Sequence, residues 1–376
     1  CSRSSIEPMA IDHPPDALPP GYCLGPYEIL RVLGRGGFGL TYQARRSGVA
    51  GDMVAIKELF PSASACRTSD MRIVALPGTH QAEIANTIDM FLREAQVICS
   101  LDHPHIVRGV DAFQANGTGY LVMRYVTGRN LRDSLRDPTG FRPSQISLPV
   151  LLVPLLDALH TLHSNELLHC DIKPDNIFLG VGFEPILIDL GSARCNKPGG
   201  GVEEAATYSA YFSAIEQISD RFGPIGPWTD IYQLSAVLYR CVTGGKLPDA
   251  VDRAAASSDP YLSLAEIPEV LQAYPRPLID AIDHGLRFHP KHRPRTVAEW
   301  RRPLESLLPR PAPPKPQSSP APSQPPPPPA PQASPYPVSA PEPSDSAPSS
   351  SPDVLLWLGG GLLLIIILIV LAVVFQ

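Results

Sequence analysis

Residues 309–353 form a tract dominated by proline, serine and alanine, which sets a limit to the folded part of the chain. The chain holds 45 prolines in 376 residues, and most of the excess lies in this tract. Such a composition cannot bury enough apolar surface to form a core, so we expect a disordered, solvated linker. The folded part of the chain should therefore end near residue 308. A docking site for a proline-recognising domain is the alternative function of the linker.

The segment after the linker, residues 354–375, is a run of 22 uncharged and mostly apolar residues. At the helical rise of about 1.5 Å per residue, the run is long enough to cross a bilayer. It predicts one transmembrane helix, with the lipid bilayer as its partner. A buried helix of a globular core is the alternative. Residues 1–24, in contrast, are polar and dotted with prolines, and they predict a flexible N-terminal segment.

The charge and the cysteines exclude other classes of protein. The net charge is −6 and the isoelectric point is near 5.9, so we expect no nucleic acid as a partner. The 7 cysteines are scattered, without a C-x-x-C pair or a metal-ligand spacing. This pattern fits a reducing compartment and predicts neither a disulfide nor a zinc site.

The residues with the most specific chemistry lie at 169–176, with the sequence HCDIKPDN, and Asp189-Leu190-Gly191 begins 13 residues after Asn176. Asp171 could accept the proton of an attacking hydroxyl group, and Lys173 could stabilise a phosphate in transfer. Asn176 and Asp189 offer two oxygen ligands for Mg²⁺. The pattern predicts a phosphoryl-transfer site. Because Asp and Asn also cap helices and shape turns, other motifs must support this interpretation.

A glycine-rich loop lies nearer the N-terminus. Strand-like residues 27–33 run into GRGGFG at 34–39, and strand-like alternation resumes at 40–44. Glycines at a hairpin tip let backbone N–H groups approach a triphosphate closely, because no Cβ intervenes. A flexible hairpin turn is the alternative. A dinucleotide-binding fold is disfavoured, because a helix would then follow the glycines.

Two further residues could complete a nucleotide site. Lys57 ends the strand-like stretch 53–57 and could reach the α- and β-phosphates. Apolar residues recur with a helical period over 84–101, and Glu94 lies beside that stripe, where it could pair with Lys57. A solvated lysine at a strand edge and a surface glutamate are the alternatives.

Taken in order, the glycine loop, V-A-I-K, the helix with Glu94, H-C-D-I-K-P-D-N and D-L-G resemble a eukaryotic-type (Hanks-type) serine/threonine protein kinase. The resemblance covers roughly residues 25–305. It implies an α+β protein kinase fold, with a small β-rich N-lobe over about 25–126 and a larger helical C-lobe over about 127–308. It also implies ATP with Mg²⁺ or Mn²⁺, and protein substrates with Ser/Thr hydroxyls. Phe60-Pro61-Ser62 and Arg67, in an insertion over 60–83, resemble a bacterial subset of the family.

The resemblance implies a role for each matching residue. Asp171 and Lys173 are the catalytic residues, and Asn176 and Asp189 are the metal ligands. The residues around ATP are Leu33, Gly34, Gly36, Gly37, Gly39, Lys57, Glu94, Met123, Arg124 and Val126. Met123 would border the adenine as gatekeeper, with an ordinary core methionine as the alternative. Lysine two places after the catalytic aspartate is the serine/threonine pattern rather than the tyrosine one.

Later motifs resemble the scaffold of the family. Residues 191–216 resemble an activation segment that ends in A-I-E where A-P-E is usual. The resemblance implies an ion pair of Glu216 with Arg293. It also implies contacts of Ser209 with the catalytic aspartate and lysine, and anchoring of the catalytic-loop backbone by Asp230.

Cys170 stands where the family usually has an arginine that pairs with a phosphorylated activation segment. A neutral cysteine cannot form that pair, so activity should depend only weakly on phosphorylation of Thr207. A redox switch is the alternative to a small buried side chain at Cys170.

The leucine pattern over 148–162 predicts a buried helix, and we expect its regular part to begin near Pro154.

The function that these motifs predict is a membrane-tethered signalling kinase that phosphorylates itself, with residues 1–353 on the cytoplasmic side, where ATP is present. A pseudokinase scaffold that recruits partners through the kinase fold and the linker is the first alternative. A small-molecule phosphotransferase is the second. A second copy of the chain, which would form a homodimer, is a further partner that the sequence leaves open.

Overall fold

The structure is a computed structural model, and it describes residues 14–307 except for 37–38, 49–50, 145–146, 191–193 and 196–208. All described residues belong to the first of two units into which the chain divides, Cys1–Pro311. The predicted linker and the apolar run over 354–375 lie outside the described residues. Within the described ranges, no helix combines the length and apolar character needed to cross a membrane.

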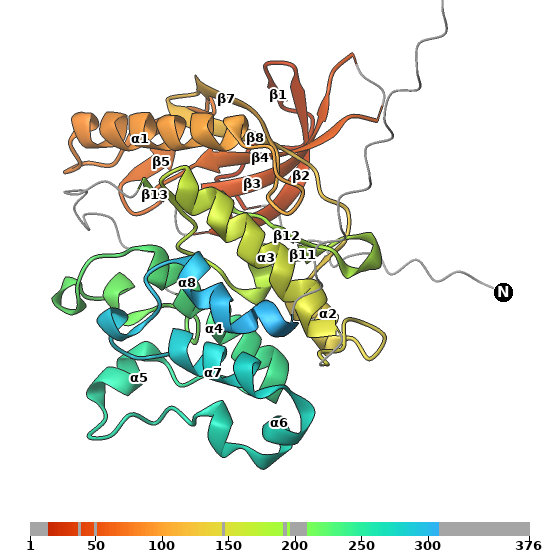
Figure 1. The fold of residues 1–376 in the computed structure, drawn as a ribbon. Helices are drawn as coiled ribbons and strands as arrows, with labels where there is room; N and C mark the ends of the chain where they lie inside the picture. The colour runs from red at the N-terminus through yellow and green to blue at the C-terminus, as the bar shows by residue number, and fades with distance from the viewer. Residues whose placement is uncertain are drawn as a thin grey trace, which may run out of the picture. The chain divides into compact units, whose positions relative to one another are not determined.

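The N-lobe is built on an antiparallel sheet against which one long helix packs (Figure 1). In sheet order the strands are β1 (Cys23–Leu24), β2 (Tyr27–Gly36), β3 (Gly39–Arg46), β4 (Met53–Leu59), β8 (Thr118–Arg124) and β7 (Gly109–Ala115). The helix α1 (Gln81–Ser100) buries one face through Ile84, Ile88, Phe91, Ala95 and Ile98. Their spacing of three and four residues forms one apolar stripe, which explains why this segment is helical and why it packs on the sheet.

The segment before β2 belongs to the N-lobe, which corrects the prediction of a flexible stretch over residues 1–24. Ala17 and Leu18 are buried, at 4% and 0% exposure, and the N–H of Leu18 donates to the hydroxyl of Tyr42 at 3.1 Å. Residues 14–24 are too few to fold alone, but the finished sheet offers them an apolar surface and hydrogen-bond partners. Only residues 1–13 lie outside the described residues here.

The insertion over residues 60–83 forms a small hairpin of its own. Strand β5 (Ala65–Arg67) pairs antiparallel with β6 (Ile73–Ala75). The N–H of Ile73 donates to the carbonyl of Asn116 at 2.7 Å, which ties the hairpin to the turn between β7 and β8. The insertion is therefore attached to the main sheet.

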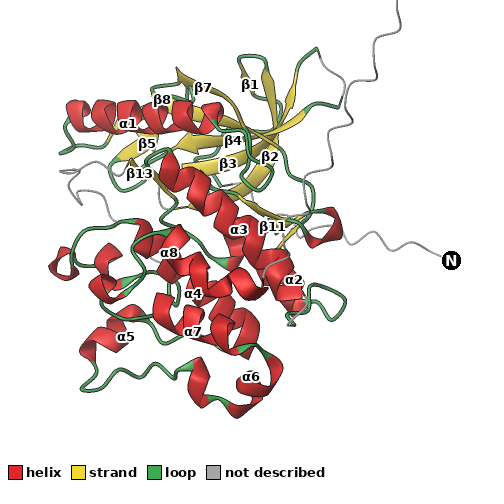
Figure 2. Ribbon diagram, viewed as in Figure 1, coloured by secondary structure: helices red, strands yellow, loops and turns green. Residues whose placement is uncertain are grey.

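The C-lobe is mainly helical (Figure 2). Its α-helices are α2 (Leu131–Arg136), α3 (Ser147–Ser164), α4 (Pro227–Thr243), α5 (Ala250–Ala255), α6 (Pro268–Ala273), α7 (Arg276–Gly285) and α8 (Val297–Arg301). Its 3₁₀ turns are η1 (Pro174–Asn176), η2 (Val181–Phe183), η4 (Ile215–Gln217), η5 (Asp220–Phe222), η6 (Leu264–Glu266), η7 (Pro290–His292) and η8 (Arg302–Leu307). Helix α4 is buried on all sides from Thr229 to Tyr239, so it forms the centre of this lobe.

Helix α3 begins earlier than predicted. It starts at Ser147 rather than near Pro154, and Pro154 lies inside it. Proline lacks the N–H that would bond the carbonyl of Val150, which lies on the exposed side of the helix at 50% exposure. Burial of Leu148, Leu151 and Leu152 outweighs the loss, since each buried leucine contributes about 1.5–3 kcal/mol.

Short strands position residues 169–176, the predicted catalytic loop. Strands β9 (Arg129–Asn130), β11 (Ile177–Leu179) and β12 (Pro185–Leu187) form one small sheet, with β11 in the middle. Strand β10 (Leu167–Leu168) pairs with β13 (Arg194–Cys195). The catalytic loop therefore leaves one strand pair and enters another, and both of its ends are held.

Candidate active site

The hairpin of β11 and β12 joins the two halves of the predicted site. Ile177 lies opposite Leu187 in this antiparallel pair, and the N–H of Ile188 donates to the carbonyl of Asn176 at 2.9 Å. Asp189 is the next residue. The two predicted metal ligands are 13 residues apart in the sequence, and they lie where the first strand of this hairpin begins and the second ends.

The carboxylate of Asp171 is the centre of a hydrogen-bonded cluster. It accepts from the ammonium of Lys173 at 3.0 and 2.8 Å, from the hydroxyl of Ser209 at 2.9 Å and from the amide of Asn176 at 2.9 Å. Lys173 also donates to the hydroxyl of Ser209 at 3.0 Å. Asp171 is only 3% exposed, so Lys173, Ser209 and Asn176 together hold its carboxylate in one orientation. The contacts of Ser209 with Asp171 and Lys173 agree with the sequence prediction.

Asp230 anchors the backbone of the catalytic loop, as the motif predicted. Its carboxylate accepts the N–H of His169 at 2.9 Å and the N–H of Cys170 at 2.8 Å, and a third bond joins it to His163 at 2.8 Å. Cys170 has a φ of 60°, a left-handed conformation that is costly for a residue with a side chain. The bonds from buried α4 stabilise this backbone, and the Cys170 side chain points into the interior, with 3% exposure.

Gln217 and Gln233 complete this support and were not predicted. Both donate to the carbonyl of Cys170, at 2.7 and 3.1 Å, and Gln233 accepts the N–H of Ile172 at 2.9 Å. Gln233 also donates to Gln217 at 2.9 Å. A signal for Gln233 was present in the sequence, because it lies three residues after Asp230 and hence on the same face of a buried helix. Gln217 connects the end of the activation segment to the catalytic loop.

Lys57 and Asp189 form an ion pair that joins β4 to the residue after β12. Asp189 has a φ of 62°, again in the left-handed region. Burial by itself raises the pKa of Asp189, but the charge and hydrogen bond of Lys57, with the nearby charges of His169 and Lys173, outweigh it, so the pKa lies below its usual 3.8. Asp189 is therefore a carboxylate at neutral pH, as a metal ligand must be.

The predicted partner of Lys57 was Glu94, and the structure shows a different pairing. Glu94 lies half-buried on α1, and among the ion pairs between described residues Lys57 contacts Asp189 instead. Glu94 lies beside the buried stripe of α1, as the helical spacing predicted. The spacing could not specify which carboxylate reaches the ammonium group, because that depends on how α1 and the C-lobe approach β4.

The remaining residues predicted to bind the nucleotide lie on β2, β3 and β8 of the sheet that carries Lys57, or directly after β8. Met123 is buried on β8 opposite Ala55, and Arg124 and Val126 continue the chain from β8 toward the C-lobe. Leu33, Gly34 and Gly36 lie on β2 and Gly39 begins β3, so the glycines do occupy the end of a hairpin. Gly37 and Thr207 lie outside the described residues.

The donor atoms fit a hard divalent cation held together with phosphates. The Nδ2 group of Asn176 is used by the carbonyl and carboxylate of Asp171, so its Oδ1 is directed elsewhere as an oxygen donor. The carboxylate of Asp189 is the second donor. No group of three or more His, Cys, Asp and Glu that could hold a metal occurs in the described part of the chain. Mg²⁺ commonly takes one or two protein oxygens plus phosphates and water, so this sparse set suits it.

A buried ion pair holds the end of the activation segment to the C-lobe, as predicted. Arg293 contacts the two carboxylate oxygens of Glu216 at 2.6 and 3.1 Å, and both side chains are 0% exposed. Thr229 donates to the same carboxylate at 2.9 Å. Such a bidentate pair fixes orientation as well as distance.

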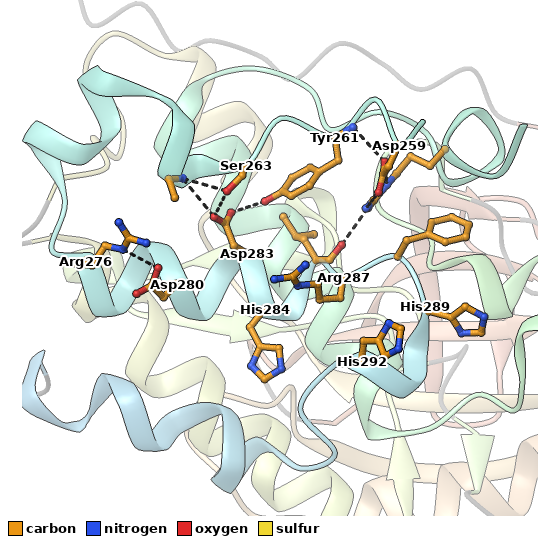
Figure 3. A pocket seen from close by; sticks show the side chains of 14 residues that line it. Asp259, Tyr261, Ser263, Arg276, Asp280, Asp283, His284, Arg287, His289 and His292 are labelled. Atoms are coloured by element: carbon orange, nitrogen blue, oxygen red, sulfur yellow. Dashed lines mark hydrogen bonds and ion pairs between the residues drawn. The ribbon is translucent and has the colours of Figure 1, made fainter. Parts of the chain in front are cut away.

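A separate cavity of about 790 Å³ lies in the C-lobe beside α7 (Figure 3). None of the predicted site residues lines it. The carboxylate of Asp283 accepts the hydroxyl groups of Tyr261 and Ser263, and Arg276 pairs with Asp280 at 2.7 Å. These polar groups stabilise each other, so we interpret this part of the cavity lining as scaffold.

The comparison with known families assigns the fold and site to one class. The model of the protein kinase domain matches residues 27–300. The chain belongs to the protein kinase domain family, and the predicted two-lobed kinase fold is confirmed.

The curated relatives that the chain matches include serine/threonine-protein kinases of bacteria. The chain is 30% identical over 246 residues to serine/threonine-protein kinase PknD of Mycobacterium tuberculosis, covering 64% of this chain and 34% of that protein. It is 30% identical over 272 residues to serine/threonine-protein kinase PkaA of Streptomyces coelicolor, covering 71% of this chain and 47% of that protein. The chain thus matches about a third to a half of the length of these relatives.

Solved structures agree on the fold. PpkA-294 in its apo form is 32% identical, with a TM-score of 0.62, and the match covers 77% of this chain and 100% of that one. The PknI kinase domain of Mycobacterium tuberculosis is 21% identical, with a TM-score of 0.55, over 78% of this chain and 100% of that one. The second match supports the fold alone.

Proposed function

We propose that this chain is an ATP-dependent protein kinase that phosphorylates serine and threonine hydroxyls, including its own. The observation that carries the proposal is the cluster of Asp171, Lys173, Ser209 and Asn176, held 2.8–3.0 Å apart. One buried carboxylate there faces a lysine and a hydroxyl group. This is the arrangement needed to orient an incoming hydroxyl beside a phosphate.

Each group has one role in the transfer. A substrate hydroxyl takes the position next to Asp171 that Ser209 borders, and its oxygen attacks the γ-phosphorus of ATP in line with the leaving oxygen. The bond from phosphorus to the β-phosphate oxygen breaks, ADP leaves with that electron pair, and Asp171 receives the proton of the hydroxyl. Lys173 offsets negative charge on the transferring phosphoryl group.

The nucleotide is held from both lobes. Lys57 binds the α- and β-phosphates, the backbone of the glycine loop covers them, and the backbone of Arg124 and Val126 contacts the adenine edge beside Met123. Asn176 and Asp189 would hold Mg²⁺, which would neutralise phosphate charge when bound. In this state Lys57 has both Asp189 and the phosphates within reach.

An activity assay tests the proposal with a matched control in the same loop. Purified protein with Mg²⁺ and ATP should phosphorylate itself and a generic protein such as casein on serine or threonine. Asp171→Asn should lower the rate about 10²- to 10⁴-fold, which is the contribution of a general base. Asp175→Asn should keep the rate, because Asp175 is paired with Arg132 at 2.5 Å, away from the cluster. An inactive wild type, or equal rates for wild type and Asp171→Asn, would refute the proposal.

We also propose that residues 354–375 anchor the domain to a membrane, with the kinase domain on the cytoplasmic side. The support is the 22-residue apolar run after a proline-rich linker, together with the need for ATP. The full chain should float with lipid vesicles in a density gradient, and a variant lacking residues 354–376 should not. Equal flotation of both would exclude the anchor. In cells, cleavage of the domain by a protease applied only from outside would exclude the cytoplasmic orientation.

A further inference from the structure

A buried ion pair lies directly beside the nucleotide-binding lysine. Glu58 follows Lys57 on β4, and its carboxylate contacts the guanidinium of Arg67 at 2.5 Å, with side chains 0% and 3% exposed. The hydroxyls of Tyr42 and Tyr120 donate to the same carboxylate at 2.7 and 2.6 Å. A buried charge with this many partners has a well-defined position, because breaking one contact leaves an uncompensated charge.

Arg67 extends this network to two other segments. Its Nε donates to the carbonyl of Asp16 at 2.5 Å, and its Nη1 donates to the carbonyl of Met71 at 3.0 Å. Its guanidinium also lies over the ring of Phe60, 5.5 Å from the centroid. The insertion over 60–83 therefore supplies the arginine that joins β4 to the segment before β2.

Asp16 in turn holds the glycine hairpin. Its two carboxylate oxygens accept from Arg35 at 2.8 and 2.6 Å, and Arg35 stands between Gly34 and Gly36 on β2. A continuous series of contacts thus runs from Arg35 through Asp16 and Arg67 to Glu58, the neighbour of Lys57.

The other strand of the hairpin approaches the same point. A Cβ added to Gly39 would lie 2.1 Å from the carbonyl oxygen of Glu58, so only glycine permits this contact. Both strands of the glycine hairpin are therefore positioned relative to Glu58. On the β3 side the restraint is direct packing, and on the β2 side it is the Asp16–Arg35 pair.

We propose that Asp16 is a positioning residue, which holds the β2 side of the glycine loop at a set distance from Lys57 and so favours nucleotide binding. This inference rests on the proposed kinase function. The pair is partly exposed, with 43% of the Arg35 side chain and 24% of the Asp16 side chain accessible, so it adds little to global stability. The bidentate contact fixes the orientation of Arg35 relative to Asp16. A glycine-rich strand needs such a restraint, because its backbone can adopt many conformations. The effect should therefore fall on ATP binding.

A double-mutant cycle on the full chain tests this role. Asp16→Ala and Arg35→Ala should each raise the KM for ATP and the Kd of a fluorescent ATP analogue about two- to five-fold, the range of an exposed ion pair. The kcat and the melting temperature should stay unchanged. The double variant should resemble either single variant, because both remove the same contact. Asp16→Glu should keep part of the wild-type affinity.

A matched control lies on the same hairpin, far from the glycines. Arg45 pairs with Glu28 at 2.7 Å, with side chains 52% and 35% exposed, and this pair also bridges β2 and β3. Glu28→Ala should leave the KM for ATP unchanged. An equal rise for Glu28→Ala would reduce the role of Asp16 to general support of the hairpin, and additive effects in the Asp16 and Arg35 cycle would also overturn it.

The outcomes separate this inference from the proposed function. If the wild-type protein is an active kinase and Asp16→Ala binds nucleotide normally, the positioning role is wrong and the proposed function stands. If the wild type has no kinase activity but Asp16→Ala still weakens binding of the ATP analogue, the proposed function is wrong and the positioning role of Asp16 stands. If Asp16→Ala lowered the melting temperature in parallel with the affinity for nucleotide, the positioning role would also be refuted.

Discussion

The ammonium group of Lys57 contacts the carboxylate of Asp189, 132 positions later in the chain. Lys57 belongs to the central strand β4 of the N-lobe, and Asp189 to the loop after β12 in the C-lobe. One ion pair therefore connects the residue expected to bind phosphates with the residue expected to bind metal. Each charge neutralises the other, with 11% of the Lys57 side chain and 38% of the Asp189 side chain exposed, so removal of either should affect the whole site.

Replacement of Lys57 tests this connection. Lys57→Met should lower kcat/KM for ATP about 10²-fold or more, since it removes a preorganised donor and leaves Asp189 without its main counter-charge. Steady-state kinetics at saturating Mg²⁺ would measure the change. The exposed Lys291 on η7 provides the control, and Lys291→Met should be silent. Less than a threefold effect of Lys57→Met would contradict its role.

Ser209 should contribute to orienting the catalytic groups. Ser209→Ala removes the hydroxyl that lies 2.9 Å from Asp171 and 3.0 Å from Lys173, so kcat should fall about ten-fold, the value of a hydrogen bond to charged groups. Ser209→Thr keeps the hydroxyl and should retain most of the activity. If Ala and Thr variants behaved alike, the hydroxyl would have no such role.

Thr207 should matter much less. Cys170 is buried and neutral, and its backbone N–H and carbonyl are held by Asp230, Gln217 and Gln233, so this position provides no cation for a phosphate on the activation segment. Thr207→Ala should therefore change kcat/KM by less than about threefold, because no charge-assisted contact of the Arg-phosphate kind is lost. Steady-state kinetics of wild type and Thr207→Ala would measure the change. The rate of wild-type protein that has been dephosphorylated beforehand would also be compared with that of untreated wild type. Near-complete loss of activity would show that another cation replaces the usual arginine.

Breaking the Glu216–Arg293 pair should destabilise the fold. Both side chains are fully buried, so Arg293→Met leaves an uncompensated carboxylate and should lower the free energy of unfolding by about 3–5 kcal/mol. Urea unfolding followed by circular dichroism would measure it. The exposed pair of Arg276 and Asp280 on α7 is the comparison, and Arg276→Ala should cost at most about 0.5 kcal/mol. Equal effects would show that burial does not govern these pairs.

Asp230 should stabilise the fold down to mildly acidic pH. Burial by itself raises its pKa, but the hydrogen bond and charge of His163, the charge of His169 and the N–H of Cys170 outweigh it, so the pKa lies below 3.8. A lowered pKa means that the stabilisation is fully present above pH 3.8 and is lost as the pH falls through the folded-state pKa.

The difference in unfolding free energy between wild type and Asp230→Asn measures this contribution. It should be similar at about pH 7 and pH 5 and shrink only at lower pH. A difference that already disappeared between these two values would mean that the carboxyl titrates with a raised pKa. Asp220→Asn on the exposed turn η5 should show no such pH dependence.

The sequence predicted most of the site because its chemistry restricts residue type. Asp171, Lys173, Asn176 and Asp189 are polar and lie shortly before or after one hairpin, and the structure brings Asp171, Lys173 and Asn176 into direct contact. Glu216 with Arg293, and Asp230 with the catalytic loop, were also predicted correctly. The start of α3 was not, because proline propensity is a local quantity, whereas burial of Leu148 and Leu151 is decided by the rest of the lobe.

The fold family, the order of the motifs and the polar groups of the candidate site could be predicted from the sequence, since those depend on residue type and near-neighbour spacing. Only the tertiary structure decided that Lys57 contacts Asp189, that Ala17 and Leu18 join the core, and that Asp16 reaches both Arg35 and Arg67. These contacts join segments far apart in the chain. Their existence depends on which surfaces the packed lobes bring within hydrogen-bond distance, and no local periodicity records that.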